Sequence, residues 1–384
     1  MIGTTTGTTT GTTMGSEVSV IVPTYNRAGL IGGALDSVLG QTYPRCHAVV
    51  VDDGSTDDTA QVLARYAANP RVQILRQRNR GVAAARNAAL AAATGAYVAF
   101  LDSDDVWYPW KLAAQVAALE GLAAKGVGML WTDMDIVDAR GQLVTPRASA
   151  TYYSAYKRLD LARDFAGSAP LATFREANPP TDGSDPAARV HWGDVLALLV
   201  RGNLCLTSSV IFTRARIAAT GRFEETMSIG DDYDYFIRAS AYGPCAYLEA
   251  STLAYRRGHA DQLTVPANTA VVLEEALRAF DRAVAQNRAG IRMTDPEVRE
   301  RRAGLNTAIG LMYLDKRDNV NARRYLLRGL VLRGLVRPQQ ASLAKLLAAC
   351  LPARATDSLR QLYRLARGAA GAPAVSRAGD APHP

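Results

Sequence analysis

The sequence is poor in cysteine and has no long apolar run. Its cysteines lie far apart without C-x-x-C spacing, which gives no indication of a zinc site or a disulfide framework and fits a reducing compartment: Cys46, Cys205, Cys245 and Cys350. No run of about 18 apolar residues occurs, so we expect no membrane span. The opening MIGTTTGTTTGTTMG has neither a basic nor an apolar signal-peptide region, and we expect residues 1–16 to be a disordered Thr/Gly tract.

The bulk composition is that of a globular protein with a basic balance. A chain of 384 residues predicts two or three domains, and 48% apolar with 21% charged residues is ordinary for such domains. A net charge of +8 and a pI near 9.4 imply attraction to anions. The charge alone does not choose between nucleotides, anionic lipids and nucleic acid.

Residues 18–112 alternate between strand-like and helical spacing, which is typical of a βαβ series. Leu30, Ile31, Ala34, Leu35, Val38 and Leu39 mark one helix face. Ser55, with Asp58 three residues on, is typical of a capping box and predicts the start of the next helix. The apolar runs predict strands at 18–22, 47–51, 72–75 and 97–101. The fold class is therefore α/β, with a mostly parallel sheet flanked by helices.

Polar side chains follow three of these strands, and carboxyl ends of parallel strands meet at the edge where ligands bind. They are Thr24, Tyr25 and Asn26, then Asp52 and Asp53, then Asp102, Asp104 and Asp105. Crowded carboxylates persist only when fully hydrated or when they hold something positive. A solvated acidic turn remains one reading of D-S-D-D. The other is a site for Mg²⁺ or Mn²⁺, which would neutralise the cluster and still bind a diphosphate.

The remainder of the chain is less regular. Residues 142–200 carry scattered Pro, Gly and Ser and predict an irregular connection, whereas Ser208–Phe212 predicts a strand followed by a short helix. The stretch SIGDDYDYFIRASAYG predicts a helix with carboxylates at its start, where the helix dipole favours them. Residues 303–332 are typical of a helical hairpin with tetratricopeptide-like spacing.

Four stretches together resemble the family 2 inverting glycosyltransferases with the GT-A fold: VSVIVPTYNRAGLIGGALDSVLGQTYP, VVVDDGSTDDTA, NRGVAAARNAALAAATGAYVAFLDSDD and SIGDDYDYFIRA. The resemblance covers roughly residues 17–265. It implies a Rossmann-like GT-A domain over 17–265, divided into a nucleotide-binding half (17–112) and an acceptor half (113–265). A helical region (270–368) and a disordered tail (369–384) would follow.

The resemblance also implies roles for individual residues. Asp53 matches the carboxylate that accepts the uracil N–H, and Asp52 supports the turn. The donor would further be bordered by Pro23, Thr24, Tyr25, Asn26, Arg86, Asn87, Asp102, Ser103 and Asp104. Arg86 would reach either the nucleotide or an aspartate of the cluster. The metal ligands would be Asp104, with Asp102, Asp105 and His259, although His259 stands one residue later than the usual Y-R-x-H spacing. Asp232 would be the general base, with Asp231 as runner-up.

Other classes lack their signatures. A dinucleotide-binding dehydrogenase needs G-x-G-x-x-G after the first strand, and a P-loop enzyme needs G-x-x-x-x-G-K-[ST]; neither occurs. A sugar nucleotidyltransferase would need a Gly-rich basic loop after the first strand to hold a triphosphate, and this loop is also absent from the sequence. A non-catalytic scaffold would not need intact carboxylates at Asp53, Asp104 and Asp232. No nucleic-acid recognition motif emerges.

The expected function is therefore metal-dependent, inverting transfer of a sugar from a UDP-sugar to a hydroxyl of a glycan or lipid-linked acceptor. We expect the protein in the cytoplasm. Residues 328–368 carry many Arg and only one acid, Asp357, which is typical of a basic amphipathic surface binder on an anionic membrane. The alternative for these helices is packing on the catalytic core.

Overall fold

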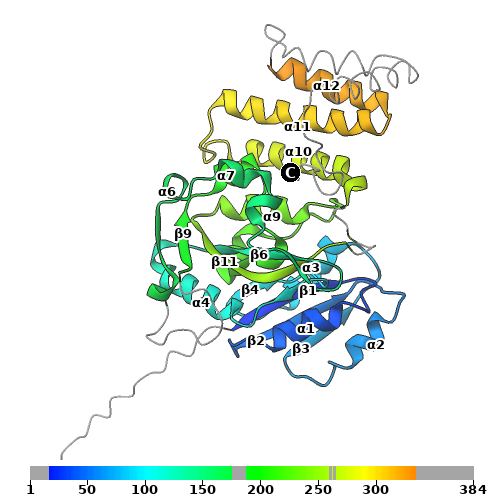
Figure 1. Cartoon of the computed structure of the whole chain (residues 1–384), viewed down its shortest axis with the longest axis vertical. Coiled ribbons are helices and arrows are strands. Elements are labelled where there is room, and N and C mark those ends of the chain that lie inside the picture. The colour runs from blue at the N-terminus through cyan, green and yellow to red at the C-terminus, as the bar shows by residue number, and fades with distance from the viewer. Residues whose placement is uncertain (1–16, 175–186, 259–261, 263–264, 334–384) are drawn as a thin grey trace, which may run out of the picture.

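In the part of the chain that the structure describes, 11 strands form one mixed sheet. The computed structural model describes residues 17–174, 187–258, 262 and 265–333 (Figure 1). The strand order is β3 (Val72–Arg76), β2 (Cys46–Asp52), β1 (Val18–Thr24), β4 (Tyr97–Phe100), β10 (Ile211–Thr213), β6 (Met129–Val137), β11 (Cys245–Arg256), β9 (Arg189–Gly193) and β8 (Gly167–Pro170). In addition, β5 (Val106–Trp107) pairs with β11, and β7 (Leu143–Thr145) pairs with β6.

The predicted βαβ series is confirmed. Strands β1 to β4 pair in parallel, and every residue of β1 is buried. Helices α1 (Ile31–Leu39), α2 (Thr59–Ala64) and α3 (Val82–Ala92) connect them. The apolar spacing explains the packing of α1, since the predicted positions Ile31, Ala34, Leu35 and Val38 are its buried residues.

The predicted capping box at Ser55 is wrong. Helix α2 begins at Thr59, and no side chain caps it. Ser55 instead stabilises the loop: its hydroxyl accepts the N–H of Asn26 at 2.9 Å, and its own N–H donates to Asp52 at 2.8 Å. The same local sequence allows the Ser55 hydroxyl either to cap a helix or to bond to another loop. Here it bonds to Asn26, 29 residues away, so it does not cap α2.

The region expected to be irregular contributes to the sheet. Strands β8 and β9 form an antiparallel pair that continues the sheet beyond β11. The short helices here are α5 (Ser149–Tyr152), α6 (Leu161–Asp164) and α7 (Leu196–Arg201), while 175–186 lie outside the described residues. Strand β10 starts at Ile211, later than predicted, because Thr207–Ser209 form a 3-10 turn.

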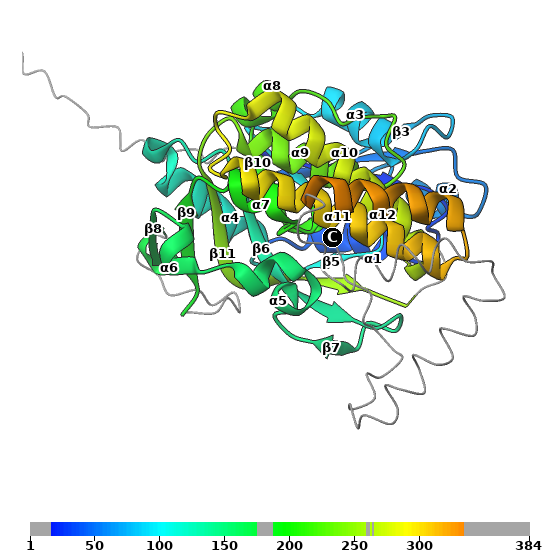
Figure 2. The same ribbon diagram turned by 90° about the horizontal axis from the view of Figure 1, so that it is seen from above.

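Helices cover the sheet and continue beyond it. Helix α4 (Lys111–Gly121) follows β5, and α8 (Arg214–Thr220) and α9 (Asp231–Ser240) follow β10. Helices α10 (Thr269–Asn287), α11 (Asp295–Asp315) and α12 (Asn319–Arg333) stack in that order above α7 and α9, and α11 and α12 run side by side (Figures 1 and 2). The predicted helical hairpin is confirmed.

Two glycines allow α11 and α12 to approach closely. A Cβ at Gly310 would stand 2.7 Å from Leu326, and a Cβ at Gly329 would stand 2.6 Å from Thr307. Helices α10 and α11 pack against the sheet, because Phe280 of α10 and Ile309 of α11 belong to the same buried cluster as Phe212 of β10. Within its described part, the helical region therefore packs on the sheet domain.

Candidate active site

The carboxyl ends of β1, β2 and β4 meet at one edge of the sheet. Thr24 is in register with Asp52, and Ile21 is in register with Phe100, so the segments after these strands are neighbours. The Thr24 hydroxyl is buried and has no hydrogen-bond partner among the described residues. A buried hydroxyl without a partner is costly, so a ligand atom at this edge would satisfy it.

Asp53 organises the loop that precedes α3. Its carboxylate accepts the side-chain amide of Gln77 at 2.7 Å and the backbone N–H groups of Arg80 and Gly81 at 3.0 and 2.8 Å. Asp52 supports the turn below, where it accepts the N–H of Ser55. Contact between Asp53 and a base stays a prediction, and within the chain its carboxylate contacts Gln77 and this loop.

Tyr25 and Asn26, the two residues after β1, have different surroundings. Pro23 and Thr24 end the buried strand, and the side chain of Tyr25 is 42% exposed beside them. Asn26 has a positive φ of 51°, and its side-chain oxygen accepts the N–H of Thr56 at 2.8 Å. Asn26 therefore joins two loops, whereas Tyr25 is the side chain presented to solvent.

The three clustered carboxylates have different surroundings. Asp105 is buried, and its oxygens accept the Ser208 hydroxyl at 2.5 Å and the Arg256 N–H at 3.2 Å, so it holds the turn to the sheet. Asp102 and Asp104 are partly exposed, and Asp104 lies 4.0 Å from the Arg27 guanidinium. Burial raises the pKa of Asp102 to about 6, Arg86 opposes this rise and Asp104 adds to it. Ser103 between them is buried.

Arg86 bridges this cluster to α9. Its guanidinium donates to Asp102 and to Asp231, both at 2.8 Å, and lies 5.6 Å from the centre of the Phe223 ring. Burial acts to lower the pKa of Arg86, but Asp231 and Asp102 together raise it. Its Nε is buried without a partner among the described residues. Of the two expected contacts of Arg86, the structure shows the one with the cluster.

Asn87 is buried and bonded to the segment before α9. Its side-chain oxygen accepts the N–H of Phe223 at 2.8 Å, and its side-chain nitrogen donates to the Phe223 carbonyl and to Glu225 at 3.0 and 2.9 Å. These bonds hold the segment before α9 against α3. These contacts give Asn87 a structural role, and its expected place at the donor stays a prediction.

Helix α9 begins with two aspartates in unlike positions. Asp231 is buried, with its carboxylate on Arg86, and burial raises its pKa against the effect of Arg86. Asp232 is partly exposed, and its oxygens accept the Thr207 hydroxyl at 2.6 Å and the N–H of Tyr233 at 2.7 Å. A carboxylate that reaches solvent can take a proton from a substrate, whereas one paired to a buried cation cannot do so readily.

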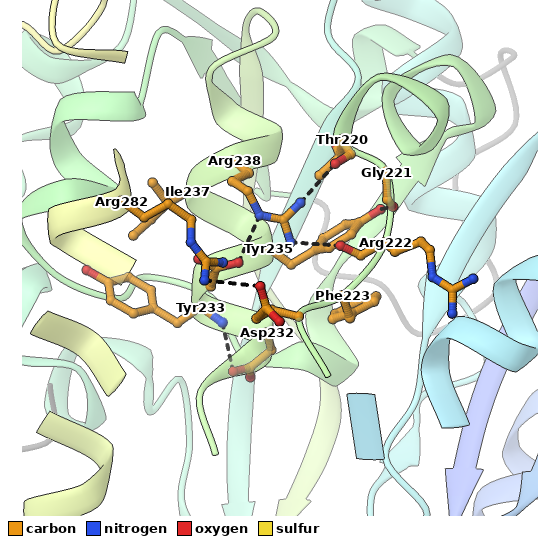
Figure 3. A network of polar contacts seen from close by, with 12 residues as sticks. Thr220, Gly221, Arg222, Phe223, Asp232, Tyr233, Tyr235, Ile237, Arg238 and Arg282 are labelled. Carbon is orange, nitrogen blue, oxygen red and sulfur yellow. Dashed lines mark hydrogen bonds and ion pairs between the residues drawn. The ribbon is translucent and has the colours of Figure 1, made fainter. Parts of the chain in front are cut away.

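A second network of hydrogen bonds and ion pairs, around Arg238 and Asp234, holds α9 in place. Arg238 donates to the carbonyls of Thr220 and Arg222 at 2.8 and 3.0 Å (Figure 3). Asp234 binds both Arg238 and Arg282. Arg282 belongs to α10, so the helical region helps to hold α9, the helix that carries the candidate base. Asp232 takes no part in these ion pairs and stays at the start of α9.

A divalent ion fits part of this donor set. Among the described residues, no three His, Cys, Asp or Glu side chains converge as a metal site. Mg²⁺ and Mn²⁺ are, however, commonly held by one or two carboxylates with the remaining positions filled by water and phosphate. Asp104 and Asp102 meet that requirement, Asp105 is committed to the fold, and His259 lies outside the described residues.

Thr207 and Lys111 lie near the candidate site and could not be predicted from the sequence. Thr207 lies 25 residues before Asp232 in the chain, and no local pattern links them. Lys111 is fully buried, donates to the Ser209 carbonyl at 3.1 Å and lies 5.0 Å from the Trp107 ring centre. Burial lowers the pKa of Lys111 well below its usual range. An apolar stretch with one lysine carries no signal that the amine is buried.

We expect Lys111→Met to stabilise the protein at neutral pH. The unfolded chain holds the Lys111 proton up to about pH 10, whereas the folded protein releases it at lower pH. Lys111 therefore lowers the free energy of unfolding at neutral pH. This loss is regained as the pH rises, by up to about 1.4 kcal/mol per pH unit. The Ser209 carbonyl keeps its bond from Gln115. Urea denaturation at pH 7 and 9 should show a gain that shrinks with pH, with exposed Lys157→Met as the control. A loss of stability at pH 7 would contradict this account.

A cavity of about 340 Å³ lies at the opposite edge, beside the amino ends of the same strands. Its polar lining is already bonded: His47 contacts Glu17 and Ser19, and Arg71 donates to backbone carbonyls and to Cys46. None of the candidate residues lines it. The candidate residues gather instead at the carboxyl edge.

Comparison with known sequences identifies part of the chain. The model of the family described as Glycosyl transferase family 2 matches residues 19–176. An uncharacterized glycosyltransferase of Nostoc sp. is 34% identical over 186 residues, which cover 46% of this chain and 57% of that relative. The chain thus spans little more than half the length of that relative.

Comparison with solved structures confirms the expected fold class. TarS of S. aureus (residues 1–349), in complex with UDP-GlcNAc, has a TM-score of 0.55 at 18% identity and covers 90% of this chain and 92% of its own. Mannosyltransferase PcManGT of Pyrobaculum calidifontis, in complex with GDP-Man and Mn²⁺, has a TM-score of 0.50 at 20% identity over 93% of this chain and 87% of its own. At these identities, the likeness shows the fold.

Proposed function

We propose, from the match of residues 19–176 to the model of glycosyl transferase family 2, that the chain transfers a sugar from a nucleoside diphosphate sugar to a hydroxyl of a glycan or lipid-linked acceptor. The observation that carries the proposal is the Arg86 bridge. It joins a carboxylate cluster suited to a diphosphate with the start of α9, where Asp232 is partly exposed. An acceptor and a donor bound at this edge would meet between these two groups.

The proposed chemistry is a single displacement. The acceptor oxygen forms a bond to the anomeric carbon while the bond from that carbon to the leaving diphosphate oxygen breaks, which inverts the configuration. Asp232 takes the acceptor proton as the oxygen attacks. Its hydrogen bonds from Thr207 and Tyr233 hold the carboxylate in one orientation during this transfer.

Asp104 and Asp102 would hold Mg²⁺ or Mn²⁺ on the donor. The ion supplies positive charge to the diphosphate, which otherwise could not approach the clustered carboxylates. The Arg86 guanidinium lies against Asp102 and offsets part of the same negative charge. Arg27, 4.0 Å from Asp104, adds a second cation at this edge.

We propose a UDP-sugar as the donor. The exposed Tyr25 ring and the partnerless Thr24 hydroxyl lie where a base would border β1. The solved complexes of TarS with UDP-GlcNAc and of PcManGT with GDP-Man show nucleotide sugars on proteins of this fold. Incubation of the protein with a panel of UDP-, GDP- and TDP-sugars and Mn²⁺, followed by detection of the released nucleotide, tests the class. Release from none of them would refute the proposal.

We expect UDP to raise the melting temperature in Mn²⁺ and hardly at all in EDTA. At a hundredfold excess over its dissociation constant, a ligand adds about 2.7 kcal/mol of stability. Asp104→Asn removes one charge from the expected ligand set and should abolish the Mn²⁺-dependent part of the shift. The exposed variant Asp58→Asn serves as the control. Equal stabilisation by UDP in Mn²⁺ and EDTA would contradict the metal proposal.

We also propose that the C-terminal helices rest on an anionic membrane. No helix of the described part is long and apolar enough to cross a membrane. The outer face of α12 combines Arg324 and Arg328 with exposed Val320, Leu327 and Val331, a composition suited to an anionic lipid surface. Most of the segment 328–368 lies outside the described residues.

Vesicle sedimentation tests this placement. A basic side chain near an anionic surface contributes about 1 kcal/mol, so Arg324→Gln and Arg328→Gln should each weaken binding to phosphatidylserine vesicles about fivefold. Exposed Arg189→Gln, on the sheet domain, is the control. Vesicle binding that is absent in the full chain, or unchanged in both α12 variants, would refute the proposal.

A further inference from the structure

The Thr207–Ser209 turn contacts both halves of the candidate site. The Thr207 hydroxyl donates to Asp232, and the Ser208 hydroxyl donates to Asp105 and accepts the backbone N–H of Asp102 at 3.0 Å. All three turn residues are buried. A single rigid turn therefore lies between the carboxylate of α9 and the cluster after β4.

Further bonds anchor the turn from below. The Ser208 carbonyl accepts the indole N–H of Trp107 at 2.8 Å, and the Ser209 carbonyl accepts from Lys111 and Gln115 at 3.1 and 2.8 Å. These donors lie on β5 and α4 and are buried. Because its carbonyls are held on the core side, the turn cannot shift without breaking several buried hydrogen bonds.

We propose that Thr207 is a positioning residue that fixes the rotation of the Asp232 carboxylate relative to the donor cluster; this inference rests on the function proposed above. An ionised carboxylate accepts hydrogen bonds and cannot donate, so the hydroxyl proton of Thr207 lies on Asp232 Oδ2. The N–H of Tyr233 binds Oδ1. With one donor on each oxygen, the plane of the carboxylate is defined, and the remaining lone pairs are available to the acceptor hydroxyl.

Thr207→Val tests this role because it keeps the side-chain shape and removes only the hydroxyl. A hydrogen bond to a charged group is worth about 1.5–3 kcal/mol, so kcat should fall roughly tenfold to a hundredfold. The KM for the nucleotide sugar should not change, because the Thr207 hydroxyl donates to Asp232 and not to a carboxylate of the proposed donor site. Thr207→Ser restores the hydroxyl and should recover most of the activity. A variant that merely loosened the fold would not show this split and rescue.

Thr226→Val is the matched control. Its hydroxyl also donates to a carboxylate, that of Glu224 at 2.9 Å, but Thr226 is exposed and this bond does not involve Asp232. We expect wild-type kcat in this variant. In the background of Asp232→Asn, Thr207→Val should cause no further loss of turnover, because the hydroxyl acts through that carboxylate.

The outcomes separate the two proposals. If Thr207→Val keeps wild-type kcat while Asp232→Asn is inactive, the positioning role is overturned and the proposed function stands. If Thr207→Val and Thr207→Ser lose kcat equally, the hydroxyl is not the active group and the inference is also overturned. If the wild-type protein transfers no sugar from any donor, the function itself fails. The inference is supported if kcat falls in Thr207→Val, recovers in Thr207→Ser and does not fall further when Thr207→Val is added to Asp232→Asn.

Discussion

Asp232→Asn should lower turnover by roughly 10²–10⁴-fold, the range in which a general base contributes to catalysis. Asparagine has the same size as aspartate, and its side-chain oxygen can still accept the N–H of Tyr233, so the start of α9 is preserved. What is lost is the carboxylate that we propose takes the acceptor proton. The rate of nucleotide release with donor and acceptor present is the measurement.

The geometry distinguishes Asp232 from Asp231. Asp231 is buried and bonded to Arg86, so its carboxylate is already neutralised by a cation of the chain. Asp231→Asn should therefore weaken the Arg86 bridge between Asp102 and α9, and it should affect the proton transfer less. Retained Mn²⁺-dependent UDP binding in Asp232→Asn would show that the site is intact. Near wild-type turnover in Asp232→Asn together with an inactive Asp231→Asn would move the base by one residue.

The sheet and its functional edge could be predicted because their signals are local. Apolar runs of strand length at 18–22 and 97–101 correspond to β1 and β4, and the apolar spacing from Ile31 to Val38 corresponds to the buried face of α1. Parallel pairing then places the segments after these strands together, since their carboxyl ends share one edge. The gathering of Thr24, Asp53 and Asp102 follows from topology alone.

The individual partners could not be predicted because they are far apart in sequence. Arg86 binds Asp231 across 145 residues, and Ser208 binds Asp105 across 103 residues. Ser55 illustrates the same limit, since its local pattern favours a helix cap and the distant Asn26 takes its hydroxyl. Three adjacent carboxylates in D-S-D-D look equivalent until the fold buries Asp105 and leaves Asp104 partly exposed.

Arg86→Met should lower the free energy of unfolding by about 3–5 kcal/mol, the cost of leaving one partner of a buried ion pair alone. Methionine keeps much of the packing on Phe223 but removes the cation between Asp102 and Asp231. Asp231 then either stays charged in a buried position or takes up a proton, and both cost stability. Urea denaturation at pH 7 measures the loss.

Two further variants show whether that loss comes from the buried charge. In Arg86→Met with Asp231→Asn, no charge is left at position 231, so the double variant should be more stable than Arg86→Met alone. Arg80→Met removes an arginine from an exposed pair with Glu225, and such pairs are worth only about 0–1 kcal/mol. If Arg86→Met and Arg80→Met were equally mild, the bridge would not be a stabilising feature. A severe Arg86→Met that Asp231→Asn relieves would instead show that the guanidinium is needed to neutralise the carboxylates between which the proposed transfer takes place.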